Sequence, residues 1–396
     1  MAEKKLPKGI TKRKDGLFMA RMKYQGETYT IYGKNAKKLE KELADLRYEV
    51  EHGLRGKGDN MTLNAWFEVW LDSLQDVRES TLVRYTQMFE MYLKEDLGKT
   101  RLKDFKQARI QRHFKKMAEE EYSTKTMKDT LVILKAMFNL AVTNDIINKN
   151  PCTGVRIAKT EDKERRVLTI EEQREVLEQA KGRVCEPLVH VALGTGMRAG
   201  ELQALTWKDI DFKNRTISIN KTLVYIPDRE TRKHYFTYQP TKTKSGTRVI
   251  PMQDDVYRAL RRQRVQIKEL QLHTSNWTPE PGFEDLVFVN VTGRPRQGMD
   301  FRNDLTRIEN AINKERKKVA KEQNKSFKPI PHFHPHTLRH TFATRCFEAG
   351  IDAKTVQNYL GHSSVAITLD LYTHVTEDKA KSEMEKLNSL YQQICV

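Results

Sequence analysis

The chain has 396 residues, enough for two or three domains that each bury a core. Its 71 Lys and Arg outnumber its 53 Asp and Glu, and the resulting net charge of +18 favours a polyanionic partner, nucleic acid before an acidic membrane surface. No apolar run reaches the ~20 residues of a membrane span and no apolar signal sequence opens the chain, so we expect a cytoplasmic protein without a membrane partner. Its four distant cysteines contain no C-x-x-C pair and indicate reduced thiols.

Residues 1–58 predict a small basic domain. Residues 1–38 hold eleven Lys and Arg against three acidic residues. Turn signals at Asp15-Gly16 and Gln25-Gly26 separate three short strands, expected over 9–14, 17–24 and 28–32. A helix over about 36–52 follows, and its apolar stripe can cover the sheet. The stripe consists of Leu39, Leu43, Leu46 and Val50.

Alternation along the middle strand gives the predicted sheet two unlike faces. Phe18, Ala20, Met22 and Tyr24 share one face, and Arg21 and Lys23 belong to the other. A sheet backed by one helix, with basic residues on its free face, can lie in a DNA major groove. The total charge favours this interpretation over a solvated basic sheet that binds nothing.

A glycine-rich connector, His52–Asp59, leads to an all-helical region over residues 61–152. Thr62 can cap the first helix, and four apolar stripes follow up to about Asn144. These aromatic stripes are typical of a core. Asn150-Pro151 ends the bundle, and 153–166, rich in Gly and charged residues, is predicted as an interdomain linker.

Residues 167–396 predict a third domain, mainly helical with a small antiparallel sheet. Thr169 and Glu172 form a capping box at the start of its first helix. Strands are expected over 215–220, 222–226, 234–238 and 247–251, with 242–246 as a hairpin turn between the last two. The predicted fold is thus multidomain: a three-stranded sheet plus helix, an all-α bundle, and a mixed α+β domain.

Five residues in this last domain carry groups suited to phosphate chemistry. They are Arg198, His336, Arg339, His362 and Tyr372. A phosphodiester repels nucleophiles and has a poor leaving group, so without a metal, cations and proton donors must assist its cleavage. Arginine binds two phosphate oxygens through its planar fork and stays charged. The set therefore indicates metal-free cleavage of a phosphodiester.

The motifs around these residues point to a catalytic role with different specificity. Arg198 follows Gly194-Thr-Gly-Met, which alone also fits a structural loop before a helix. His336 and Arg339 are three residues apart, so they share one helix face. His332, His334, His336 and His340 admit a zinc site as an alternative, but the sequence lacks an H-E-x-x-H glutamate and a nearby cysteine. We therefore expect no metal and no cofactor, whereas a metal hydrolase would lose activity in EDTA.

The order Arg, His-x-x-Arg, Gly-His, Tyr resembles the tyrosine recombinase family, which includes the phage integrases. Three phrases carry the resemblance: Thr195–Trp207, Pro335–Thr341, and Leu360-Gly-His362 through Tyr372. The likeness covers nearly the whole chain and looks nearest to integrases of conjugative transposons from Gram-positive bacteria. It implies an arm-type DNA-binding domain over 1–58, a SAM-like core-binding domain over 61–152, and a catalytic domain with a C-terminal tail helix over 167–396.

The resemblance also implies a role for each residue. Tyr372 would attack the scissile phosphate and form a 3′-phosphotyrosyl link, while Arg198 and Arg339 would bind the non-bridging oxygens. His336 would assist deprotonation of the tyrosine, whose pKa is ordinarily ~10, and His362 would hydrogen-bond the phosphate. Lys244, with Lys242 as a rival, matches the lysine that protonates the leaving group. Glu201 matches an acidic position that orients the site.

The family further implies double-stranded DNA with core and arm sites as substrate, a homotetramer on synapsed DNA, and accessory DNA-bending and excisionase proteins. We expect a bacterial, nucleoid-associated integrase that integrates and excises a mobile element. A type IB topoisomerase would share the chemistry without strand exchange, and a non-catalytic DNA-binding regulator would form no covalent adduct. The stripe Met384, Leu387, Leu390, Tyr391 and Ile394 would dock either on a neighbour or on its own domain.

Overall fold

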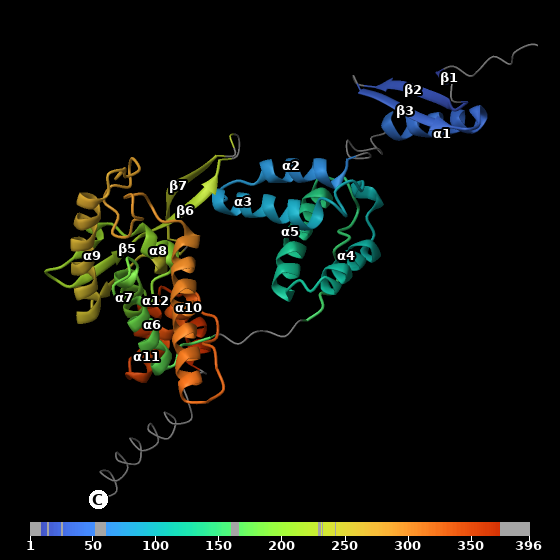
Figure 1. Ribbon diagram of the computed structural model, residues 1–396. Coiled ribbons are helices and arrows are strands. Elements are labelled where there is room, and N and C mark those ends of the chain that lie inside the picture. Colours follow the sequence, from blue (N-terminus) through green and yellow to red (C-terminus); the bar gives the residue numbers. More distant parts are fainter. Residues whose placement is uncertain are drawn as a thin grey trace, which may run out of the picture. The chain divides into compact units, whose positions relative to one another are not determined.

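The computed structural model describes residues 9–13, 16–24, 27–51, 61–159, 166–228, 231, 233–241 and 243–372. The chain divides into two compact units, Met1–Asp162 and Lys163–Val396 (Figure 1). The predicted turns at Asp15-Gly16 and Gln25-Gly26 fall largely on residues outside the description, as does the C-terminal stripe from Met384. The exact boundaries expected for the domains stay a prediction.

The N-terminal sheet and its helix form as expected. Strands β1 (Ile10–Lys12), β2 (Phe18–Tyr24) and β3 (Glu27–Gly33) are antiparallel in the order β1-β2-β3. Helix α1 (Ala36–Glu51) packs on one face of this sheet (Figure 1). Arg21 and Lys23 are exposed, which confirms the predicted division between the two faces. The residues buried between sheet and helix include Ile10, Ala20, Met22, Leu39, Leu43 and Leu46.

A bundle of helices follows in the same unit. It comprises α2 (Leu63–Ser73), α3 (Glu79–Met88), a π-helical turn η1 (Phe89–Leu93), a 3-10 turn η2 (Leu102–Asp104), α4 (Gln107–Glu119) and α5 (Thr124–Thr143). The Thr62 hydroxyl accepts the Ala65 N–H at 3.4 Å, so the predicted cap of the first helix is confirmed. Trp66, Phe67, Phe114 and Phe138 are buried in its core, as their stripes predict.

The first part of the predicted linker packs on this bundle. Val155 and Ile157 lie against its core, and Gln111 exchanges two hydrogen bonds, each of 2.9 Å, with the backbone of Arg156. The Thr124 hydroxyl donates to the Ala158 carbonyl at 3.0 Å. Residues 155–159 thus have more partners than their polar composition suggests.

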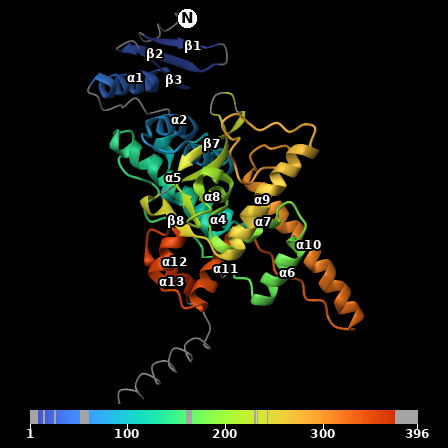
Figure 2. The same ribbon diagram turned by 90° about the vertical axis from the view of Figure 1, so that its left-hand side faces the viewer.

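The second unit is mainly helical. Its helices are α6 (Ile170–Ala180), α7 (Glu186–Thr195), α8 (Ala199–Ala204), α9 (Asp254–His273), α10 (Gly298–Glu322), α11 (Pro335–Glu348), α12 (Ala353–Leu360) and α13 (Val365–Tyr372). The capping box of Thr169 and Glu172 at α6 is confirmed. Helices α11, α12 and α13 pack against one another at one end of the unit (Figure 2).

Two small antiparallel sheets complete the described part of this unit, and they correct one prediction. Strands β4 (Ile210–Asp211), β5 (Thr216–Ile219) and β8 (Arg248–Pro251) form one sheet, while β6 (Lys221–Pro227) and β7 (His234–Pro240) form the other. The turn predicted over 242–246 therefore does not close a hairpin, because the strands before and after it, β7 and β8, belong to different sheets. The cause is packing, since pairing β8 with β5 sets Ile250 opposite Ile217, and both are buried in the main core.

The cysteines within the described residues are unpaired, as their spacing in the sequence predicts. Cys152, Cys185 and Cys346 are buried free thiols, and burial raises their pKa to about 12, 11 and 12. Within the described ranges no helix is both long and apolar enough to cross a membrane.

Candidate active site

Arg339 holds two turns of the second unit together. Helix α11 begins with Pro335, a residue suited to a first helical turn, and this start puts Arg339 on its buried side. The side chain is only 4% exposed and donates to the carbonyls of Gly196 and Leu360, both at 2.7 Å. Burial, and then the nearby charge of Arg198, lower its pKa to about 9. A cation this costly to bury indicates a site for an anion.

Arg198 stands where α7 ends and α8 begins. Gly196 closes α7 with φ +61°, and a Cβ there would lie 2.4 Å from the ring of Phe342, so this turn requires glycine. The Arg198 guanidinium donates to Glu201 at 2.7 Å and to the Gly361 carbonyl at 3.4 Å. Its side chain remains 40% exposed, which leaves it accessible to a ligand.

Glu201 is a buried carboxylate between two arginines. Its oxygens accept from Arg198 and from both Nη atoms of Arg248, the latter at 3.2 and 2.9 Å. Burial alone would raise the pKa of this carboxyl, but hydrogen bonding and charge from Arg248 and Arg198 lower it below its usual range. Arg248 also donates to the carbonyls of Tyr359, at 2.6 Å, and Gly246, at 2.9 Å. The predicted orienting role of Glu201 thus has a structural basis.

His362 is buried next to these cations. Its Nδ1 lies 2.9 Å from the Thr368 hydroxyl of α13, and its carbonyl accepts from the Gln357 side chain. Burial, followed by the charges of Arg339 and Arg198, lowers the pKa of His362 to about 3. The imidazole is therefore neutral at physiological pH and keeps Nε2 for another partner.

His336 lies at the start of α11, on its exposed side. The rings of His334 and His340 are 6.1 and 6.5 Å away. Partial desolvation, then the charge of Arg339, lower the pKa of His336, so at neutral pH it can accept a proton. Among the described residues, no group of three or more His, Cys, Asp or Glu is arranged to hold a metal ion.

Lys244 lies in the short turn η4 (Lys244–Gly246), where it is exposed. This turn lies against the end of α12. Gly361, with φ +64°, approaches it so closely that a Cβ would lie 2.8 Å from the Ser245 carbonyl oxygen. The rival Lys242 lies outside the described residues.

Tyr372 is the last residue of α13, and its side chain lies outside the description. Helix α13 packs on both α11 and α12. The backbone that bears the tyrosine is thereby tied to α11, which carries Arg339, and to α12, which ends two residues before His362.

Sequence reasoning missed Arg248. It is 6% exposed in its side chain and binds Glu201 directly. The only signal available was a basic residue at the start of the short Val-Ile-Pro strand, of which only Ile250 is buried, and such residues are common at strand ends. Its role depends on contacts 47 and 111 positions away in the sequence.

The profile described as the phage integrase family matches residues 160–379, and that of a phage integrase N-terminal SAM-like domain matches 62–118. The chain belongs to the phage integrase family. A tyrosine recombinase XerC-like protein of Caldanaerobacter subterraneus is 30% identical, over 91% of each chain. The transposase of transposon Tn916 from Enterococcus faecalis is 29% identical, over 98% of this chain and 96% of its own.

Solved structures agree with these sequence relatives. The Tn1549 transposon integrase, in complex with a circular intermediate DNA, is 28% identical with a TM-score of 0.66, covering 83% of this chain and 99% of its own. A lambda integrase dimer at 18% identity and a TM-score of 0.53 shares the fold. The predicted tyrosine-type site-specific recombinase, similar to conjugative-transposon integrases, is confirmed. The topoisomerase and regulator alternatives are not favoured.

Glu201→Gln should lower the free energy of unfolding by ~3 kcal/mol near pH 7, because Arg248 would lose its buried counter-charge. The pKa of Glu201 is lowered in the folded protein, so its stabilisation is fully present above the ordinary value of 4.5 and is lost as pH falls through the lowered pKa. Urea unfolding should therefore show the difference from wild type shrinking below about pH 4.5.

The matched control is Glu178→Gln, in an exposed pair with Lys181, which should change the free energy by less than ~0.5 kcal/mol. A Glu201 variant as stable as this control would contradict the proposed importance of the buried pair.

Proposed function

We propose that Arg198, His336, Arg339 and His362 bind and activate a scissile DNA phosphate that Tyr372 attacks. The observation that carries the proposal is the proximity of both histidines to both arginines, since the charges of Arg339 and Arg198 act on His336 and His362 alike. Burial, and in each case also the charge of Arg198, lowers the pKa of Arg339, His336 and His362, which supports one shared electropositive site. A phosphate diester would supply the missing negative charge.

The two arginines divide the work of binding. Arg339 gives one N–H of each Nη to a backbone carbonyl, and its remaining N–H groups are left for phosphate oxygens. Arg198 donates from Nη1 to the Glu201 carboxylate, and 40% of its side chain remains exposed. Each guanidinium is thus fixed before the substrate arrives, which favours stabilisation of the pentacoordinate transition state.

The histidines take different parts in the reaction. The tyrosine hydroxyl gives its proton to neutral His336 as its oxygen bonds to phosphorus. Neutral His362, oriented by Thr368, donates from Nε2 to a non-bridging oxygen. The bond from phosphorus to the 5′ oxygen breaks, and Lys244, or its rival Lys242, gives that oxygen a proton.

Reversal of the same step completes a recombination event. The 5′-hydroxyl of a partner strand attacks the phosphotyrosine, so bond energy is conserved and no ATP, metal or other cofactor is consumed. We propose that this exchange integrates and excises a mobile element. It would take place within a homotetramer on two synapsed duplexes, with accessory DNA-bending and excisionase proteins, at the bacterial nucleoid in the cytoplasm.

The division of labour along the chain follows from charge and exposure. Residues 1–58 would bind arm sites through the exposed Arg21 and Lys23, and 61–152 would grip the core site. Residues 153–166 would join these domains to the catalytic domain, 167–396. The DNA complexes of the Tn1549 integrase support DNA as the substrate.

Incubation with a suicide substrate carrying an end of the element should give a covalent protein–DNA adduct, resolved by denaturing electrophoresis. Tyr372→Phe should give none, because phenylalanine has no nucleophilic oxygen. Tyr359→Phe, at a half-buried tyrosine packed against the core, is the matched control and should retain the adduct. EDTA should leave the yield unchanged. An adduct with the Tyr372 variant would assign the nucleophile elsewhere.

The rate of adduct formation should be constant near pH 7 and fall only below pH 6.5, the ordinary histidine value. The reason is the lowered pKa of His336, which keeps this base neutral until more acidic pH. His362, with a pKa of about 3, stays neutral throughout. In single-turnover measurements, His336→Gln should abolish the acidic limb. A limb that persists in this variant would show that another group is titrating.

A substrate with sulfur in place of the 5′ bridging oxygen separates the two candidate lysines. A thiolate leaves without a proton, since thiols have a pKa of ~8.5, so loss of the proton donor matters only for the oxygen substrate. The Lys244→Ala variant should cleave the oxygen substrate ~10²–10⁴-fold slower than wild type does. On the sulfur substrate its cleavage rate should recover towards that of wild type. His336→Gln, which lacks the base, should not recover. Recovery by Lys242→Ala alone would give the role to Lys242.

A further inference from the structure

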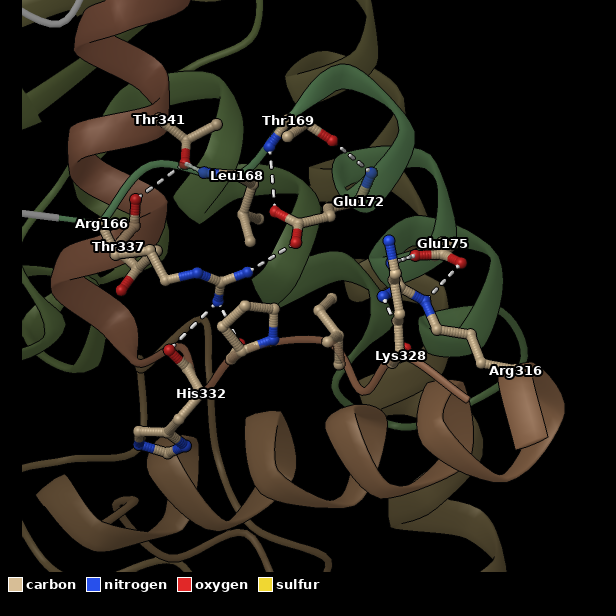
Figure 3. Close-up of polar contacts among 12 residues, drawn as sticks. Arg166, Leu168, Thr169, Glu172, Glu175, Arg316, Lys328, His332, Thr337 and Thr341 are labelled. Carbon is tan, nitrogen blue, oxygen red and sulfur yellow. Dashed lines mark hydrogen bonds and ion pairs between the residues drawn. The ribbon is translucent and has the colours of Figure 1, made fainter. Parts of the chain in front are cut away.

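Arg166 anchors the point at which the chain enters the second unit. Its guanidinium donates to the carbonyls of Pro331 and His332, the latter at 3.1 Å, and to Glu172 at 2.8 Å (Figure 3). It also lies over the Phe333 ring, 5.9 Å from the centroid. One side chain thus joins α6 to the three residues 331–333.

The residues after Arg166 bind the helix that those three residues lead into. The Leu168 N–H donates to the Thr341 hydroxyl at 3.0 Å, and Arg345 donates to the Leu168 carbonyl at 2.7 Å. The Thr341 hydroxyl in turn donates to the Thr337 carbonyl (Figure 3). Both Thr337 and Thr341 are buried. The segment 166–168 therefore holds α11 from its N-terminal approach to its third turn.

His336 lies between these two attachments. It is the second residue of α11, so its ring position depends on where 331–334 and the first turn of the helix are fixed. Arg166 reaches that segment from α6 and uses its planar fork on three acceptors, which a shorter or single-headed side chain cannot reproduce. Its hydrogen bonds to 331 and 332 are to backbone carbonyls, so they fix the path of the chain there.

We propose that Arg166 is a positioning residue for His336. The inference rests on the proposed function, in which His336 takes the proton of the attacking tyrosine. Without Arg166 the approach to α11 would shift, and misplacement of a reacting group by ~1 Å can cost ~10²-fold in rate. Among the described residues, Arg166 contacts Pro331, His332, Phe333 and Glu172, and none of these is a proposed phosphate ligand, so DNA binding should be unaffected.

Arg316 provides a matched control in the same network. Like Arg166, it pairs with a glutamate of α6, here Glu175 at 2.6 Å, and contacts a carbonyl of the segment before α11, here Lys328 at 3.4 Å (Figure 3). It holds the far end of that segment. Removing Arg316 therefore imposes a similar loss of packing and charge without releasing the approach to His336.

The test measures single-turnover cleavage of the suicide substrate by the full chain at saturating DNA, with core-site affinity measured separately. Arg166→Ala should cleave ~10-fold slower with affinity within ~2-fold of wild type, and Arg166→Lys should recover part of the rate. Arg316→Ala should remain within ~2-fold. In the His336→Gln background, Arg166→Ala should cost less than ~2-fold, because the group it positions is gone.

The outcomes separate this proposal from the one it rests on. An inactive wild type, or His336→Gln at the wild-type rate, would overturn the proposed function itself. If His336→Gln is slow but the Arg166 and His336 effects multiply, or Arg316→Ala is as slow as Arg166→Ala, the positioning role is wrong. Should thermal unfolding show that Arg166→Ala does not fold, Arg166→Lys carries the same double-mutant cycle and decides the matter.

Discussion

The site depends on one buried ion cluster, the Glu201 carboxylate between Arg198 and Arg248. A buried arginine without a counter-charge is strongly unfavourable, so the carboxylate allows two guanidinium groups to lie at the surface of a core. Arg248 extends the cluster to backbone carbonyls on either side, at Gly246 and Tyr359. The turn after β7, the start of α8 and the end of α12 are thereby fixed to one point. Each of these carries or adjoins a proposed catalytic residue.

The cluster neutralises only part of the charge that converges there. Glu201 is one anion, while Arg198, Arg248 and Arg339 are three cations. The pKa values of His336 and His362 are lowered first by burial and then by this excess of positive charge. The histidines therefore stay neutral, which suits one to accept a proton and the other to donate a hydrogen bond. Residual positive charge and neutral imidazoles both suit the site to the anion that we propose DNA supplies.

Features set by neighbouring residues could be predicted from the sequence, whereas contacts between segments far apart in the chain mostly could not. The alternating face of β2 and the stripe of α1 follow from periodicity and appear as expected, and so do the caps at Thr62 and Thr169. The spacing of His336 and Arg339 correctly places both residues on one helix, α11, while their catalytic roles stay a prediction. Arg248 and the pairing of β8 with β5 were missed, because both depend on contacts between segments far apart in the chain. Local patterns carry no information about which strand a buried isoleucine will oppose.

The same distinction between local pattern and distant contact applies to the segment predicted as a linker. A composition rich in charge and glycine indicated that 153–166 only connects, yet its last residue binds the approach to α11 through three acceptors. Helix α11 in turn holds Arg339, which ties together the turns at Gly196 and Leu360. Arg166 and Arg339 therefore act on the same helix from two sides, one fixing the residues that lead into α11 and the other fixing the turns packed against it. If the proposed role of His336 is right, the last residue of the predicted linker takes part in setting the geometry of the site, and a charge-rich composition alone gives no sign of this.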